Sequence, residues 1–265
     1  MATFGRDDEL EGAVFTGANL RGARFDRSRL RDVRIVNSDV TGLVVRGCGV
    51  DEVEIDDPWL AGVGSFRVNG VDVVPYVEGE LNRQFPGRSL RRATDPDGLR
   101  EAWSALQETW GATLARAAEL PEGTVDVSVE GEWSFAQTLR HLVMATDTWL
   151  GKAVLGLDQP YHPLGLANAE AADDGLDMSL FSSERPPYAE VLAARADRTR
   201  MVDDFLASVT PGRLDEPRRN PWAPEYPETV RSCLHTILEE EWEHHRYAVR
   251  DLAVITGDDG GLATD

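Results

Sequence analysis

Apolar residues recur at a five-residue spacing near the start of the chain. From residue 14 the sequence divides into the blocks "VFTGA NLRGA RFDRS RLRDV RIVNS DVTGL VVRGC GVDEV", and the second position of each block is a large apolar residue. The full series is Leu10, Phe15, Leu20, Phe25, Leu30, Ile35, Val40, Val45, Val50 and Ile55. Smaller residues, mostly Ala, Ser, Val or Cys, stand two positions before the large ones. This period fits neither a helix nor a flat strand. It predicts a narrow four-sided β-solenoid whose coils bury their side chains on one another.

The five-residue pattern ends at "DDPWLAGVG", where a proline and two glycines interrupt it. The following "FRVNGVDV" predicts a β-hairpin, because Asn69-Gly70 is the dipeptide that two-residue hairpin turns favour. We therefore expect a first domain over residues 1–64, with the solenoid and a linker. A second domain over 65–265 would begin with the hairpin.

The second domain has its apolar residues at spacings of three and four, which predicts long amphipathic helices. Their starts are marked by Asp95-Pro96, Ser134 and two prolines before Tyr188, and the last ends at Gly257. The sequence thus predicts an α+β chain: a short right-handed quadrilateral β-solenoid followed by a four-helix bundle. A connection rich in Gly, Pro and Asp, from about residue 156 to 187, is expected to be either a lid or an unpacked excursion.

The last helix carries two overlapping Glu-x-x-x-His pairs in "EEEWEHHRYAVRDL". With Leu234 as reference and a rotation of about 100° per residue, Glu241 falls at about −20° and His245 at about +20°. Glu240 and His244 fall at about −120° and −80°. The buried stripe is defined by apolar residues within about 60° of the reference: Ile237, Ala248, Leu252 and Ile255. Helical phase therefore directs Glu241 and His245 into the core.

A buried Glu and His one helical turn apart are spaced to bind one metal ion. An isolated carboxylate in a core costs several kcal/mol unless it is neutralised, paired or bound to a cation. The alternative is a Glu–His hydrogen bond or a salt bridge to an arginine across the core. A third ligand would come from another helix, and His141 in "TLRHLVMATDTWL" is the candidate. Its helix is apolar around so much of its circumference that phase does not decide which way His141 faces, and a hydrogen-bonded core histidine is the alternative.

The net charge of the chain limits the classes of molecule that it is expected to bind. The formal net charge is −20 and the pI is about 4.6, which argues against nucleic-acid binding because that needs clustered Lys and Arg. No stretch reaches the roughly 18 apolar residues of a membrane span, and the start lacks the pattern of a secretory leader. We therefore expect a cytoplasmic protein with no membrane partner. Cys48 and Cys233 do not form a CxxC motif and are expected to be reduced.

Residues 8–57 resemble the pentapeptide-repeat family through their five-residue period. The family's Ala-Asn/Asp-Leu core is retained in "ANL" at Ala18–Leu20, and later blocks shift towards Val. The resemblance implies about four blocks per coil, and so a solenoid of only two to three coils that needs to dock against something else.

Residues 90–255 resemble the DinB/YfiT-like four-helix bundles, in which a histidine on the second helix and a pair on the fourth bind one divalent metal. The matching stretches are "WSFAQTLRHL" and "EWEHHR", with Glu in place of a first His as in the mycothiol-dependent maleylpyruvate isomerases. The resemblance implies His141, Glu241 and His245 as ligands. Zn²⁺ is favoured over Ni²⁺ or Fe²⁺.

The same resemblance implies a small-molecule substrate and a thiol such as mycothiol or bacillithiol, used in S-transfer or isomerisation of an electrophile. Some members of the family have degenerate sites, so the resemblance leaves open whether the chain is an enzyme. His162 on the long connection could donate a proton, and Arg246 could orient an anionic substrate; an exposed loop histidine and an arginine paired with carboxylates are the alternatives. We also expect a homodimer, since DinB-like bundles often dimerise.

A non-catalytic role competes with the enzyme hypothesis. Acidic pentapeptide-repeat proteins include DNA mimics that bind type II topoisomerases, and a net charge of −20 suits that role. Ten blocks offer a short surface for it, however. The repeat could instead mediate self-association alone.

Overall fold

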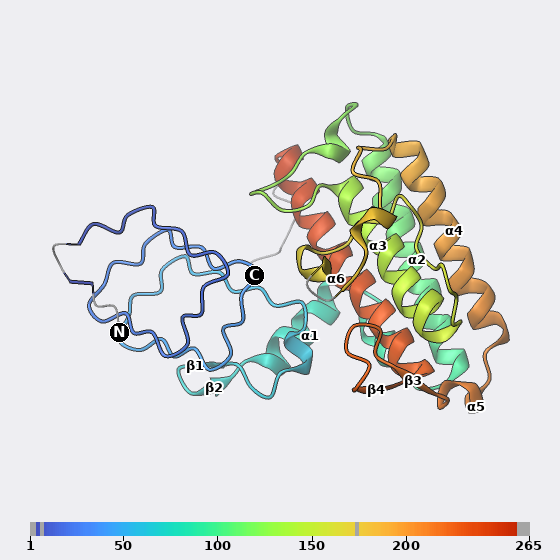
Figure 1. The fold of residues 1–265 in the computed structure, drawn as a ribbon, viewed down its shortest axis with the longest axis horizontal. Helices are drawn as coiled ribbons and strands as arrows, with labels where there is room; N and C mark the ends of the chain where they lie inside the picture. The colour runs from blue at the N-terminus through green and yellow to red at the C-terminus, as the bar shows by residue number, and fades with distance from the viewer. Residues whose placement is uncertain (1–3, 6–7, 173–174, 259–265) are drawn as a thin grey trace. The chain divides into compact units, whose positions relative to one another are not determined.

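The computed structural model describes residues 4–5, 8–172 and 175–258. The chain divides into two compact units, Met1–Ile55 and Asp56–Asp265 (Figure 1). This division falls some residues before the predicted boundary at residue 64. Each unit has its own organisation.

The first unit repeats a backbone turn every five residues. Left-handed φ angles occur at Gly12, Gly17, Gly22, Arg27, Asp32, Asn37, Gly42, Gly47 and Glu52. Hydrogen bonds close some of these turns, as from the Ala23 amide to the Leu20 carbonyl at 2.9 Å. A period seen in the side chains is therefore also a period of the main chain.

The packed β-solenoid is not shown. No strand occurs among the described residues of this unit. The large apolar side chains that were predicted to form its core are 46–63% exposed. In the structure, the five-residue pattern sets where the chain turns, but the coils do not bury these side chains on one another.

The second unit begins with the predicted hairpin. β1 (Arg67–Val68) pairs antiparallel with β2 (Val71–Asp72). Asn69 and Gly70 between them both have positive φ, 50° and 85°, as a type I′ turn requires. The hairpin prediction is confirmed.

Six α-helices follow among the described residues: α1 (Val74–Gln84), α2 (Pro96–Ala118), α3 (Phe135–Thr146), α4 (Tyr188–Ser208), α5 (Pro211–Leu214) and α6 (Val230–Thr256). A second small hairpin, β3 (Pro217–Arg219) with β4 (Pro227–Thr229), precedes α6. The residues that were predicted to begin or end helices do so in the structure. The Asp95 side chain caps α2, Ser134 and Gln137 form a capping box at α3, and α6 ends at Gly257 with φ 65°.

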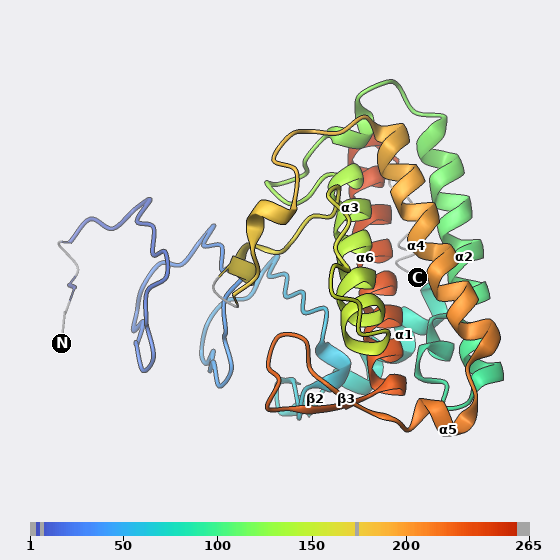
Figure 2. The ribbon, with the colours of Figure 1, turned by 45° about the vertical axis from the view of Figure 1, so that its right-hand side comes forward.

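The four long helices α2, α3, α4 and α6 run side by side around one apolar core (Figures 1 and 2). In the ring that they form, α3 packs between α4 and α6, and α2 closes the opposite side. Fully buried members of the core include Leu99, Leu106, Leu139, Leu142, Ile237 and Leu252. Among the described residues, no helix combines the length and apolarity needed to cross a bilayer.

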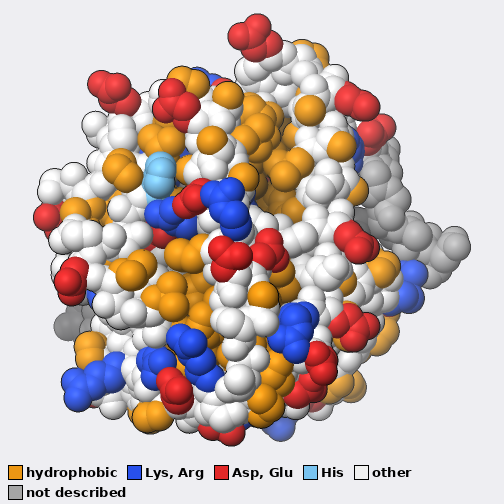
Figure 3. Space-filling view, turned by 90° about the vertical axis from the view of Figure 1, so that its right-hand side faces the viewer, with side chains coloured by type: hydrophobic (Ala, Val, Ile, Leu, Met, Phe, Trp, Pro, Cys, Tyr) orange, Lys and Arg blue, Asp and Glu red, His pale blue; other side chains and the backbone are white. Residues whose placement is uncertain are grey.

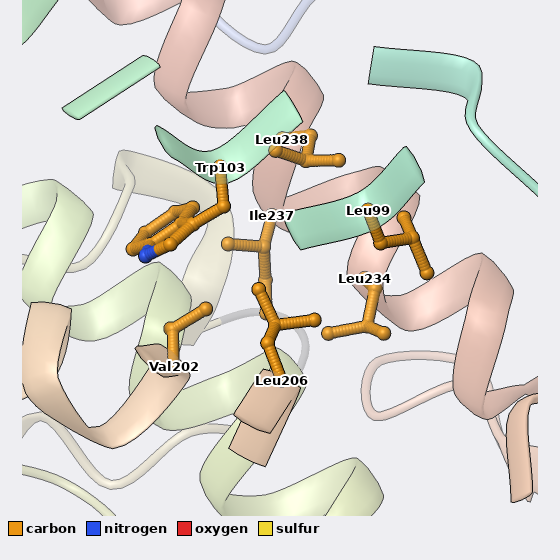
Figure 4. A pocket seen from close by; sticks show the side chains of 7 residues that line it. All are labelled: Leu99, Trp103, Val202, Leu206, Leu234, Ile237 and Leu238. Carbon is orange, nitrogen blue, oxygen red and sulfur yellow. The ribbon is translucent and has the colours of Figure 1, made fainter. Parts of the chain in front are cut away.

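A cavity of about 10 Å³ lies inside this core between α2, α4 and α6 (Figure 4). It is lined by Leu99, Trp103, Val202, Leu206, Leu234, Ile237 and Leu238. A space near the size of one water with only apolar walls stays dry, so it is a packing gap and offers no binding site for a substrate.

α3 continues into a π-helical segment, Asp147–Val154, and the long connection to α4 then packs back on α3. Met144 forms an apolar cluster with Ala167 and Ala171, joined by Tyr161 and Phe181. The alternative of an unpacked excursion is therefore wrong for the described part of the connection.

One face of the second unit mixes charges of both signs (Figure 3). On the face shown in Figure 3, Arg and Lys side chains lie among Asp and Glu, with apolar side chains between them. The net charge of −20 is therefore not gathered on this face.

Candidate metal centre

His141, Glu240 and His244 converge at the contact between α3 and α6. Each offers one ligand atom, and these atoms all lie within 4.8 Å of one another. His141 Nε2 is 3.3 Å from Glu240 Oε2, and His244 Nδ1 is 3.4 Å from the same oxygen. His141 is buried and the two α6 residues are half-buried. Glu240 and His244 are one turn apart, so they present their side chains to α3 together.

Hydrogen bonds to carbonyls assign the tautomers of both histidines. His141 Nδ1 lies 3.1 Å from the Leu166 carbonyl oxygen, and His244 Nδ1 lies 2.8 Å from the Glu240 carbonyl oxygen. A carbonyl only accepts, so each Nδ1 carries a hydrogen and each Nε2 remains for another partner. In a neutral His141, the Nε2 lone pair then faces a carboxylate oxygen, and two acceptors need a proton or a cation between them. This donor set therefore fits a metal ion.

The pKa values of the cluster also favour metal binding. Burial alone would raise the pKa of Glu240, but a protonated His141, through its hydrogen bond and its charge, holds that pKa below its usual value. Burial and the neighbouring His141 lower the pKa of His244 to about 4. At neutral pH the carboxyl is therefore ionised and His244 is neutral, which are the forms that bind a metal.

Aromatic rings border the cluster. The Trp133 ring lies 4.6 Å from the His141 ring and 6.0 Å from the His244 ring, between centroids. The two imidazoles are themselves stacked at 4.6 Å, and Tyr247 meets His244 edge-on at 6.1 Å. Trp133 therefore shields both imidazoles from water on one side.

The predicted pair Glu241 and His245 does not join His141. Glu241 Oε2 accepts a hydrogen bond from Arg195 on α4, and His245 Nε2 lies 2.8 Å from Thr113 Oγ1 on α2. Helical phase was right that both are buried, at 1% and 3% exposure. The residues that could hold a metal together converge instead on the neighbouring face of α6. His141 of α3 faces Glu240 and His244. Helical phase places these two residues at about −120° and −80°, away from the centre of the stripe, and the sequence analysis gave them no role.

His162 and Arg246 are also placed differently from their proposed catalytic roles. His162 Nδ1 accepts from the Leu164 amide at 3.1 Å, and its own amide donates to Asp147 at 2.7 Å. It is not among the residues that the cluster brings together. Arg246 spans both oxygens of Asp56 at 2.9 and 2.6 Å and also pairs with Glu243. Its guanidinium is already occupied by carboxylates, as the simpler alternative proposed.

Two arginines before α2 form ion pairs with buried glutamates of α6, and the sequence analysis did not predict these pairs. Glu239 pairs with Arg91 at 3.0 Å, and Glu243 pairs with Arg88 at 2.8 Å. Both glutamates immediately precede a residue of the cluster and are buried. These ion pairs fix the rotation of α6 about its axis, and so direct Glu240 and His244 towards α3.

Comparison with known protein families agrees with this architecture. A model of the DinB superfamily matches residues 105–248, more than half of the chain. The chain belongs to the DinB superfamily. A model of eight pentapeptide repeats matches residues 9–42. No curated protein and no solved structure matches the chain.

Members of the DinB superfamily generally bind a metal, and all three residues of the cluster fall within the matched range. α1 and the arginine turn Arg88–Arg92 lie before it. The ion pairs that brace α6 in this DinB chain are thus made in part by residues outside the matched domain.

Proposed function

We propose that this DinB chain binds one divalent metal through His141, Glu240 and His244, and uses it with a low-molecular-weight thiol in S-transfer or isomerisation of a small electrophile. The observation that carries the metal proposal is the convergence of two imidazoles and one ionised carboxylate within 4.8 Å, at a half-buried position. At neutral pH Glu240 is ionised and His244 is neutral, and these forms bind a cation.

The ligand types favour Zn²⁺, with Ni²⁺ and Fe²⁺ as alternatives. Three protein ligands leave room for a further one, and a metal bound there would lower the pKa of a coordinated water or thiol towards neutral. The choice of a thiol rests on analogy with thiol-dependent members of the superfamily.

The protein's own residues have distinct parts in this proposal. Glu240 supplies a negative charge against the cation. The Leu166 carbonyl holds the Nδ1 hydrogen of His141, so that Nε2 faces Glu240. Trp133 covers the two imidazoles and limits the access of water.

Elemental analysis of the full chain, purified without a metal-affinity column, tests the metal proposal. We expect about one divalent ion per chain, as a site with three protein ligands binds. Addition of mycothiol or bacillithiol to Co²⁺-loaded protein should then produce a thiolate-to-metal charge-transfer band, because a coordinated thiol is deprotonated. Protein that takes up no divalent ion would contradict the metal proposal. A metal-loaded protein with no response to either thiol would contradict only the thiol.

A second candidate function is self-association through the repeat unit. Its large apolar side chains are 46–63% exposed, which favours a partner that covers them. Sedimentation of the full chain should then reveal a dimer that Phe15→Ser with Phe25→Ser weakens. If the partner is instead a topoisomerase, the full chain should inhibit DNA supercoiling by gyrase, and His141→Ala should inhibit equally.

A further inference from the structure

We infer that the connection between α3 and α4 is part of the metal site, and that Arg140 is a positioning residue for the ligand His141. The inference rests on the proposed metal function and extends it to residues that touch no metal. Three sets of contacts carry it: those of Leu166, those of Arg140, and those of His162 with Asp147.

The backbone amide and carbonyl of Leu166 form hydrogen bonds with two consecutive residues of α3. Its amide donates to the Arg140 carbonyl at 3.1 Å, and its carbonyl accepts from His141 Nδ1, also at 3.1 Å. The position of the connection and the orientation of the imidazole are therefore linked through the backbone of a single residue, Leu166. A histidine whose Nδ1–H is held in this way must present Nε2 to a metal.

The Arg140 side chain holds this part of the connection in place. Its Nε donates to the Leu164 carbonyl at 2.9 Å, and its Nη2 donates to the Ser182 carbonyl at 3.2 Å. Arg140 is only 7% exposed, and among the described residues no carboxylate pairs with it. A buried guanidinium without a carboxylate is costly. Here its hydrogen bonds join two separate parts of the connection, at Leu164 and at Ser182.

A second attachment of the same connection lies further along the helix and provides a control. The His162 amide donates to Asp147 Oδ2 at 2.7 Å, and Asp147 also pairs with Arg198 on α4. These contacts anchor the connection without reaching His141. A variant here loosens the connection, whereas an Arg140 variant also removes the support of the ligand.

The test compares Zn²⁺ affinity, by competition with a chromophoric chelator, in the full-length parent, Arg140→Met and Asp147→Asn. Arg140→Met should weaken Zn²⁺ binding by about 10- to 100-fold, the usual cost of losing the support of a ligand. Asp147→Asn should bind as the parent does. Arg140→Gln places an amide nitrogen where the arginine has Nε, so it should restore much of the affinity. The Co²⁺ absorption spectrum should change in Arg140→Met only, because ligand orientation alters the coordination geometry.

A direct measurement covers the case in which Arg140→Met does not fold. In the Zn²⁺-loaded parent, the nitrogen NMR spectrum of His141 should show a hydrogen on Nδ1 that exchanges slowly with water, and coordination through Nε2. Coordination through Nδ1 would overturn the inference, as would a folded Arg140→Met with the affinity and the spectrum of the parent. A parent that binds no Zn²⁺ would instead overturn the proposed function itself.

Discussion

Two Glu-x-x-x-His pairs lie side by side on α6, offset by one residue, and their surroundings differ completely. Glu240 and His244 face the histidine of α3 at a half-buried position. Glu241 and His245 are buried beneath α4 and α2, against Arg195 and Thr113. The same residue types at the same spacing thus form a candidate metal site on one face and a structural contact on the next. What the neighbouring helices present to each pair decides between the two.

The different surroundings shift the pKa values of Glu240 and Glu241 in opposite directions. Burial raises the pKa of Glu241, and the Arg195 guanidinium offsets only part of that rise. For Glu240, the neighbouring histidines outweigh burial and lower the pKa. Arg195 also places a permanent cation against Glu241, where a metal would have to bind. The Arg195 guanidinium therefore excludes a metal ion from Glu241, whereas the histidines beside Glu240 can bind one.

The largest expected effect is on stability, from breaking the buried ion pair. Arg195→Met leaves the Glu241 carboxylate without its partner, and loss of one member of such a pair costs about 3–5 kcal/mol. Denaturant unfolding measures this loss. The double variant Arg195→Met with Glu241→Leu should recover most of it, and Zn²⁺ affinity should stay unchanged throughout. If the double variant were as unstable as the single one, the charge of Glu241 would not be the cause.

The next effect is a dependence of protein stability on pH that arises from the burial of His245. Burial lowers the pKa of His245 to about 4, against 6.5 in the unfolded chain. The folded state therefore binds fewer protons, so stability is complete above pH 6.5 and is lost as the pH falls towards 4. The loss reaches about 3 kcal/mol at most. With a chelator present, unfolding of His245→Gln should vary less over this range than unfolding of the parent; equal slopes would mean that His245 does not titrate as its burial implies.

Metal affinity distinguishes the two faces directly. His244→Ala removes one of three ligands and should weaken Zn²⁺ binding by about 100-fold or more, which is beyond the usual cost of losing a supporting contact. His245→Ala should bind Zn²⁺ as the parent does while unfolding more readily. The reverse result, with affinity lost in His245→Ala alone, would move the site to the Glu241 face.

Much of this arrangement was predictable from local sequence signals. Capping residues such as Ser134, the Asn69-Gly70 turn and the C-terminal Gly257 act over a few residues, and the structure uses them as predicted. Helical phase also predicted the burial of Glu241 and His245, because it depends only on a regular rotation along one helix.

What could not be predicted depends on contacts between distant parts of the chain. His141 lies on a helix that is apolar on most sides, so its direction follows from how α3 packs against α6. Arg195 lies between alanines in the sequence, which says nothing about its partner, and only the approach of α4 to α6 brings it to Glu241. In the repeat unit, the five-residue pattern predicted the turns but not the exposure of its apolar side chains, since burial requires a surface from elsewhere.

The smallest expected effect tests the only side-chain hydrogen bond that His245 makes among the described residues. Thr113→Val keeps the shape of the side chain but removes the hydroxyl 2.8 Å from His245 Nε2. The buried imidazole is left unpaired, so unfolding should become easier by about 1–2 kcal/mol. Thr109→Val, on the same helix, is the matched control with a smaller loss, because its hydroxyl bonds only to the Ala105 carbonyl within the described part of the chain. Zn²⁺ affinity should not change in either variant, because neither hydroxyl lies on the His141 face; weaker binding in Thr113→Val at unchanged stability would show that the two pairs act together.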